Sequence, residues 1–155
     1  MPEKQTMLII RKATPADAEA LHDLYFNHLT ANPPAETQDM AVWREKLSRF
    51  GTDPFYHLLV GEIDGQVISS VTLIIIENLT HNLRPYAVIE NVVTHAAHRS
   101  KHYATELMNR ASDIASELGC YKIMLMTGSK EGRTLRFYEN CGYNMNDKTA
   151  FIKWL

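Results

Sequence analysis

A short basic turn, "AAHRSK" at residues 96–101, lies between an apolar run and an amphipathic segment and is the first candidate for chemistry. Arg99 and Lys101 give this turn two permanent positive charges. The first amides of a helix have no partners inside it, and the helix dipole leaves positive potential at its start. Together these donors and charges would hold a phosphate or pyrophosphate. An ordinary helix start with solvated side chains fits the same residues, so both interpretations stay open.

Glu90 is a second candidate, because it is a carboxylate inside the otherwise apolar run "YAVIENVVTH" at residues 86–95. A carboxylate in such a strand indicates a function or a charged partner. The alternation of a strand also permits an outward-facing glutamate at a sheet edge, and the sequence does not decide between the two. His95 and His98 lie three positions apart, but no third ligand follows at a suitable spacing, so no metal is expected.

The elements that must position these residues follow from hydrophobic periodicity and from helix and turn signals. Strands are expected at residues 7–13, 55–63, 66–76, 86–95, 120–126 and 149–155, and helices at 14–29, 39–50, 101–118 and 131–142. A break is expected between the first two helices because of paired prolines. The order is therefore β-α-α-β-β-β-α-β-α-β.

This order predicts one α/β domain over residues 1–155, built on a mixed sheet with helices on both faces. Asp64-Gly65 suits a two-residue hairpin turn and predicts antiparallel strands around it. The later strand–helix–strand unit requires a right-handed crossover and a parallel pair. The basic turn then lies at the carboxyl end of that pair, where α/β folds bind ligands. The polar pair Glu90 and Asn91 suggests a bulge that would open the sheet there.

The totals limit the possible classes of protein. A chain of 155 residues, 45% hydrophobic and 22% charged, is typical of one globular domain. A net charge of -2 gives no support for a nucleic-acid partner. No apolar run is long enough to span a membrane, and the start does not read as a signal peptide. Cys120 and Cys141 are expected to be reduced thiols, and a cytoplasmic location is expected.

The run "VIENVVTHAAHRSKHYATEL" at residues 88–107 resembles the cofactor loop of the GNAT superfamily of acyl-CoA-dependent N-acyltransferases. The family pattern is Arg/Gln-x-x-Gly-x-Gly/Ala. Arg99 matches its first position and Ala104 its last, whereas His102 stands where the family has its first glycine. "IIRKATPADAEAL", "LLVGEIDGQVISSVTL" and "ELGCYKIMLMT…LRFYENCGY" resemble the other segments of the family in the right order. "GCYKIML" and "IENVV" are similar to the glucosamine-phosphate acetyltransferase branch and related bacterial small-molecule enzymes.

The resemblance implies a GNAT fold, in which a mostly antiparallel sheet has a central parallel pair splayed at the cofactor site. It also implies direct transfer of an acetyl group from acetyl-CoA to a primary amine of a small molecule. The amine must lose a proton, because its conjugate acid has a pKa of about 10, and Glu90 is the implied base. Tyr138 in "RFYENCGY" is the implied acid for the leaving thiolate. A core aromatic on an amphipathic helix is the alternative for Tyr138.

The resemblance places the donor along the end of the strand and the start of the following helix. The backbone of Val92, Val93 and Thr94 would pair with pantetheine. The remaining contacts are implied for Arg99, Ser100, Lys101, His102, Tyr103, Ala104, Thr105 and Thr134. His102 can keep the turn, since histidine tolerates positive φ better than most residues. Two hypotheses for the protein are compatible with a histidine side chain at this position. One is an active enzyme with a modified pyrophosphate-binding turn, and the other is a non-catalytic module that binds or senses acyl-CoA.

The acceptor is expected to be a small-molecule amine bound by the first two helices and the loop "ENLTHNLRPY". Arg84, with His81 and Arg49, would favour an anionic group on that amine. A solvated loop arginine is the alternative. A homodimer is possible, because the expected last strand, "AFIKWL", offers a sheet edge.

Overall fold

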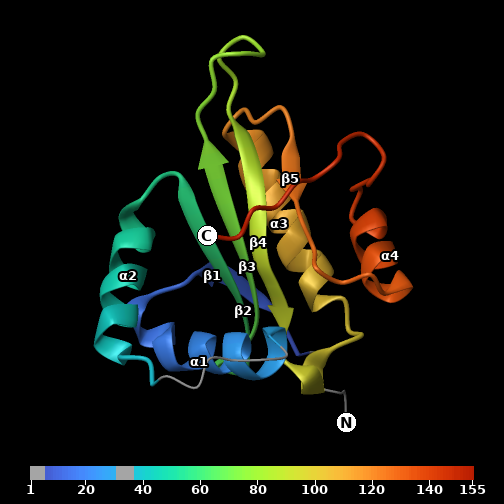
Figure 1. Ribbon diagram of the computed structural model, residues 1–155. Helices are drawn as coiled ribbons and strands as arrows, with labels where there is room; N and C mark the ends of the chain where they lie inside the picture. Colours follow the sequence, from blue (N-terminus) through green and yellow to red (C-terminus); the bar gives the residue numbers. More distant parts are fainter. Residues whose placement is uncertain (1–5, 31–36) are drawn as a thin grey trace.

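The computed structural model describes residues 6–30 and 37–155, and in this part of the chain a single five-stranded sheet has the order β1-β2-β3-β4-β5 (Figure 1). The strands are β1 Ile9–Lys12, β2 Tyr56–Ile63, β3 Gln66–Ile76, β4 Tyr86–Thr94 and β5 Ile123–Leu125. The helices are α1 Ala18–Asp23, α2 Met40–Thr52, α3 Tyr103–Glu117 and α4 Gly132–Asn140. Three short turns of other helix types are η1 Pro15–Asp17, η2 Leu24–Leu29 and η3 Ala96–His98.

The sheet is mixed, as the sequence predicts. Strands β1 to β4 pair antiparallel with their neighbours, and β4 pairs parallel with β5. Helix α3 covers one face, where its apolar side packs on β3 and β4; α1, η2 and α2 cover the other face (Figure 1). Two separate apolar clusters fill these layers. The α3-side cluster includes Leu73, Ile89, Leu107 and Met108, and the second cluster, on the side of α1 and α2, includes Leu21, Leu47 and Val60. No helix in the described part of the chain is both long and apolar enough to cross a bilayer.

The first helical segment starts at a buried ion pair. Asp17, only 6% exposed, accepts hydrogen bonds from Nη1 and Nη2 of Arg11 at 2.7 and 2.8 Å and from the Thr14 amide at 2.7 Å. Burial alone would raise the pKa of Asp17, but these hydrogen bonds outweigh it, so the pKa lies below its usual value. The pair thereby fixes the start of the helix to β1.

This segment does not stay a regular α-helix. Its last part, η2, has π-helical hydrogen bonding, which the sequence did not predict. π-Helical turns are rare and occur frequently at functional sites. The wide turn carries both Tyr25 and His28, and η2 packs against β4.

The strand expected at residues 149–155 is absent, so that prediction is wrong. β5 has only three residues, which gives a further strand little backbone to pair with. Phe151 and Trp154 are instead exposed, at 90% and 87%. Without this strand, the parallel pair lies at the edge of the sheet and not at its centre. The expected break between the first two helices lies largely outside the described residues.

A β-bulge divides β4, as the polar pair Glu90 and Asn91 suggested. Glu90 is opposite Thr72 and Val93 is opposite Ser70, so two residues of β4, Asn91 and Val92, face one residue of β3. Asn91 has a positive φ of 52°. β5 pairs with residues 87–89 only. Beyond Ile89, therefore, β4 has β3 on one side and no described strand on the other.

Candidate acyl-transfer site

The turn between β4 and α3 takes a left-handed conformation without any glycine. Ser100 has a φ of 62°, and His102, the N-cap of α3, has φ 64° and ψ 12°. Glycine usually occupies such positions because it lacks a Cβ, although histidine enters this region more readily than most residues. The turn therefore keeps its shape with His102 in place of a glycine, as expected from the sequence.

The start of α3 presents free backbone donors beside this turn. The first amide to bond inside the helix is that of Glu106, which donates to the His102 carbonyl at 3.1 Å. The amides of Tyr103, Ala104 and Thr105 precede it, and the His102 side chain makes no capping hydrogen bond. The helix dipole and the exposed Lys101 add positive potential here. This arrangement can bind an anion.

The Arg99 side chain has a different environment from the one expected. Its Nε donates to the Thr94 carbonyl at 3.1 Å and its Nη2 donates to the His28 carbonyl at 2.9 Å. Arg99 thus ties the turn to the end of β4 and to η2. The guanidinium keeps its positive charge and further N–H donors while it binds these two carbonyls, and its expected contact with the pyrophosphate stays a prediction.

Arg133, which sequence reasoning missed, reaches the same turn from α4. Its Nη2 donates to Oγ of Ser100 at 2.9 Å. Thr134, the expected contact on α4, is the next residue and lies in the same first helical turn. The sequence gives one signal for Arg133, which is that a cation directly precedes the expected contact residue Thr134. Lys101 and Arg133 therefore add to the positive charge of Arg99 at this turn.

The expected pantetheine-contacting residues lie on the unpaired end of β4. Val93 is buried, and its carbonyl accepts a hydrogen bond from Oγ of Ser69 on β3 at 2.8 Å. The Thr94 hydroxyl also contacts this serine, at 2.9 Å. Val92 packs against the α3-side cluster. These contacts fix one side of β4 and leave its other edge available to an extended ligand.

Glu90 faces the α1 and α2 side of the sheet, just before the bulge. It is exposed, and it lies opposite Thr72 of β3, which is itself opposite Leu58 of β2. Tyr56 of β2 is close enough for the Glu90 charge to contribute to the raised pKa of its phenol, after burial and Tyr25. The carboxylate thus stands next to a group of hydroxyl-bearing side chains.

Tyr138 lies on α4, the helix that follows β5. It is partly buried against the α3-side cluster. Burial is the main reason that the pKa of Tyr138 is raised, and the charges of Cys141 and Glu90 raise it further. The Glu90 charge thus acts on the phenol, although Tyr138 packs on the α3 side of the sheet and Glu90 faces the other side. A protonated phenol and a carboxylate can act as an acid and a base.

Arg84 binds backbone carbonyls away from Glu90, and its expected contact with substrate stays a prediction. Its Nε and Nη2 donate to the carbonyls of Gly119 and Cys120, both at 3.0 Å, so it caps the carboxyl end of α3. Arg84 precedes β4, whereas Glu90 lies about 13 Å along that strand from its first residue. His81 stacks on Tyr121 in the same region, with ring centroids 3.9 Å apart.

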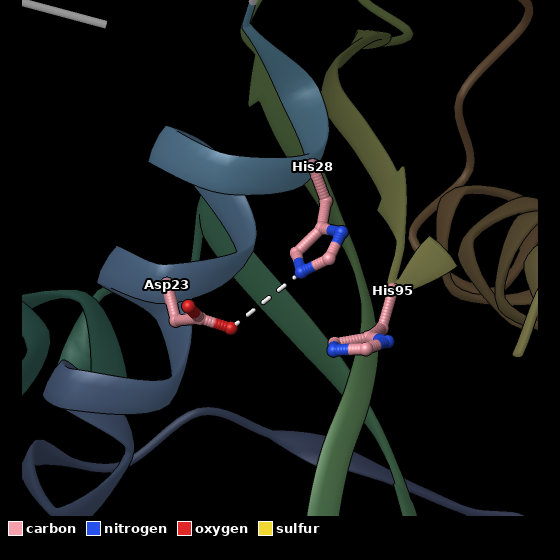
Figure 2. Close-up of side chains that lie close together, drawn as sticks. All are labelled: Asp23, His28 and His95. Carbon is pink, nitrogen blue, oxygen red and sulfur yellow. Dashed lines mark ion pairs between the residues drawn. The ribbon is translucent and has the colours of Figure 1, made fainter. Parts of the chain in front are cut away.

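Asp23, His28 and His95 form a cluster (Figure 2). The sequence spacing did not reveal it, because it had linked His95 only with His98. The possible ligand atoms of the three lie within 4.8 Å of one another. However, Nδ1 of His28 accepts from the Ala96 amide at 3.2 Å, and Nδ1 of His95 accepts from Ala97 at 3.1 Å.

These two hydrogen bonds determine what the cluster can do. A neutral imidazole that accepts at Nδ1 carries its proton on Nε2. Both rings therefore direct N–H donors, and not metal-binding lone pairs, away from the backbone. In metal sites the pattern is usually the reverse, since the second ring nitrogen donates. The cluster instead connects η2 to the turn after β4, alongside the Arg99 bond to His28.

Comparison with known proteins gives a family match over most of the chain. A model of the acetyltransferase (GNAT) family matches residues 18–143. The "Probable glucosamine 6-phosphate N-acetyltransferase" of Drosophila melanogaster is 30% identical over 91 residues, which are 59% of this chain and 40% of that protein. The glucosamine 6-phosphate N-acetyltransferase of Arabidopsis thaliana is 26% identical over 98 residues, 63% of this chain and 64% of that protein. The matched segments thus span less than two thirds of either relative.

Solved structures match over almost the whole chain. A protein of Agrobacterium tumefaciens str. C58 that is assigned to the acetyltransferases has a TM-score of 0.80 and 34% identity, over 94% of this chain and 99% of that one. The glucosamine-6-phosphate N-acetyltransferase of Arabidopsis thaliana has a TM-score of 0.77 at 20% identity, over 96% and 98% of the two chains. This second similarity concerns the fold alone.

Proposed function

The chain belongs to the acetyltransferase (GNAT) family, and we propose that it transfers an acetyl group from acetyl-CoA to a primary amine of a small molecule. The transfer is direct, within a complex that holds both substrates. The observation that carries this proposal is the unpaired end of β4, which has Glu90 just before it and the free amides at the start of α3 after it.

The residues of the chain fit acetyl-CoA, which supplies the acetyl group as an activated thioester when bound. The free amides of residues 103–105 and the charges of Lys101 and Arg133 suit its diphosphate. The unpaired edge of β4 at residues 91–94 suits pantetheine, whose amides would bond to it as an added strand does. One backbone amide of this edge would polarise the thioester carbonyl.

Glu90 would accept a proton from the ammonium of the acceptor, directly or through one water. Because it is exposed and follows directly on the paired part of β4, it can meet an acceptor that enters from the α1 and α2 side. Its position opposite the buried Thr72 fixes the backbone from which it reaches out. A general base in such a position typically contributes a factor of about 10² to 10⁴ to the rate.

Tyr138 would give its proton to the thiolate as it leaves. The raised pKa of this phenol keeps the proton on the oxygen at neutral pH, so the group is ready to act as an acid. The nearby Glu90 charge favours that protonated state. The amine nitrogen bonds to the acetyl carbon as the carbon–sulfur bond breaks, and the thiolate takes the Tyr138 proton. The second proton that the amine loses as the amide forms would restore the Tyr138 phenol.

The test is the acetylation of a panel of amines by the purified protein, with calorimetry of acetyl-CoA binding alongside. Wild type should bind acetyl-CoA and release thiol when an amine is present. Glu90→Gln should bind acetyl-CoA equally well, yet lose about 100-fold or more in kcat. Binding of acetyl-CoA without any turnover would instead support the sensor alternative. An unaltered kcat in Glu90→Gln would exclude this carboxylate as the base.

A further inference from the structure

Two buried hydroxyls beside Glu90 have no hydrogen-bond partner among the described residues: those of Tyr25 and Thr72. Thr72 is only 1% exposed and lies in the middle of β3. Its neighbour Ser70 has a partner, since its Oγ donates to the Leu59 carbonyl at 2.9 Å. Burial raises the pKa of the Tyr25 phenol, and Ser70 and Thr72 lie close enough to offset part of that rise, yet the Tyr25 and Thr72 hydroxyls complete no hydrogen bond of normal geometry. Buried hydroxyls in folded proteins nearly always have a partner, so these two keep hydrogen-bonding capacity for a ligand.

Both hydroxyls lie on the face of the sheet that carries Glu90. Thr72 stands directly opposite Glu90, and Tyr56 is the diagonal neighbour of Thr72 on the adjacent strand. Tyr25 comes from the π-helical turn η2, which packs over β3 and β4. Its ring rests near Trp43 of α2, with centroids 6.1 Å apart. The cluster formed by Tyr25, Tyr56, Thr72 and Glu90 is called the hydroxyl cluster below.

The hydroxyl cluster contains one negative charge and no positive one. Burial is the main reason that the pKa values of Tyr25 and Tyr56 are raised, and the side chains that also act on them are hydroxyls, a phenol and Glu90, with no lysine or arginine among them. Arg84 and Arg99, on the loops at either end of β4, bind backbone carbonyls instead. A phosphate or carboxylate on the acceptor would therefore meet no lysine or arginine among the groups that act on Tyr25 and Tyr56, and would be repelled by Glu90.

We propose that Tyr25 and Thr72 bind a hydroxyl group of the acceptor, and that the acceptor is a small hydroxylated primary amine without an anionic group. This inference rests on the function proposed above. The ammonium of such a molecule is attracted by Glu90, and its hydroxyl can both donate to and accept from the two unpaired side chains. Some relatives carry the name of a phosphorylated amino sugar acetyltransferase, so the inference distinguishes this chain from them.

The charge part of the inference is tested with two acceptors that differ only in a phosphate. Thiol release from acetyl-CoA is measured with glucosamine and with glucosamine 6-phosphate as probes. Glucosamine should have a kcat/KM at least about tenfold higher. A preference for glucosamine 6-phosphate overturns the inference, as does equal use of both.

The hydroxyl part is tested with Tyr25→Phe and Thr72→Val, each of which removes one unpaired hydroxyl and keeps the shape. Each should raise the KM for glucosamine about tenfold, in line with the loss of one hydrogen bond, and leave the KM for acetyl-CoA unchanged. Thr72→Ser, which keeps the hydroxyl, should stay near wild type. If Tyr25→Phe folds poorly, the Thr72 pair alone decides. Unaltered KM values for glucosamine in the folded variants overturn this assignment.

Tyr143→Phe is the matched control, since Tyr143 also has a buried hydroxyl without a described partner but packs on the α3 side of the sheet. It should leave the KM for glucosamine unchanged. A chain that takes up no acetyl-CoA refutes the proposed function itself. Acetyl-CoA uptake with turnover of 1-aminopentane only, or with no turnover of glucosamine, overturns the substrate class and leaves the donor site intact.

Discussion

Replacement of Tyr138 by phenylalanine tests the proposed acid most directly. The change removes one oxygen and keeps the ring that packs against the α3-side cluster. Without a proton donor, the thiol of CoA must leave as the thiolate. An alkyl thiol with a pKa of about 8.5 lies about 1.5 units above pH 7, and each unit corresponds to about 1.36 kcal/mol. The lost assistance is therefore about 2 kcal/mol.

This free energy corresponds to a loss of about 30-fold in kcat at pH 7. The loss should shrink about tenfold for each unit of rising pH and disappear near pH 8.5, because the thiolate then needs no donor. Wild-type Tyr138 does not lose its own proton over this range, since its pKa is raised above the usual value of 10.0 by burial first and then by Cys141 and Glu90.

The assay is thiol release at saturating acetyl-CoA and amine, from pH 6.5 to 9. The ratio of wild-type to variant kcat at each pH cancels the titration of the amine. Tyr143→Phe is again the control, because burial also raises the pKa of Tyr143 on the same part of the chain. An undiminished kcat in Tyr138→Phe at pH 7, or a loss that stays constant up to pH 9, would refute the reasoning.

Two further predictions concern stability and the turn. Asp17→Asn should lower the free energy of unfolding by about 1.5 kcal/mol at pH 7 in urea titrations, because it removes one of the two carboxylates that bind Arg11, which is partly exposed and keeps its contact with Glu62. Since the folded pKa of Asp17 lies below 3.8, wild type should lose this stability as pH falls below that value, and the variant should not. His102→Gly should keep the turn and the affinity for acetyl-CoA, whereas His102→Val should lose about 1 kcal/mol of stability at its φ of 64°. Equal unfolding midpoints for the two His102 variants would contradict this.

The features that follow from neighbouring residues were predictable from the sequence. The hairpin around Asp64-Gly65, the amphipathic α3 and the bulge at Glu90 and Asn91 each depend on a few adjacent positions, and the structure has all three. The left-handed His102 belongs to the same class, because local backbone preference decides it. Glu90 and Tyr138 were chosen with the help of a family pattern, and their catalytic roles stay a prediction.

The features that depend on distant contacts were not predictable. Arg99 and Arg84 bind carbonyls of other elements, and no local pattern reveals which carbonyl lies within reach. The contact between Ala96 and His28 joins residues 68 positions apart. The prediction of a strand at residues 149–155 was wrong for a related reason. The pattern of that segment suits a strand, but β5 is too short to pair with it. The candidate role of Tyr25 in acceptor binding depends on the position of its π-helical turn over β4, which no local pattern predicts.

The bulge in β4 has a consequence for how this strand can change over time. Ile89 and Val92 both contact the α3-side cluster although they are three positions apart, whereas regular alternation places residues two or four apart on one face. The extra residue therefore resets the phase of the strand. Substitutions on the acceptor side before it and on the thioester side after it can accumulate separately, while deletion of one residue there would turn every later side chain to the opposite face.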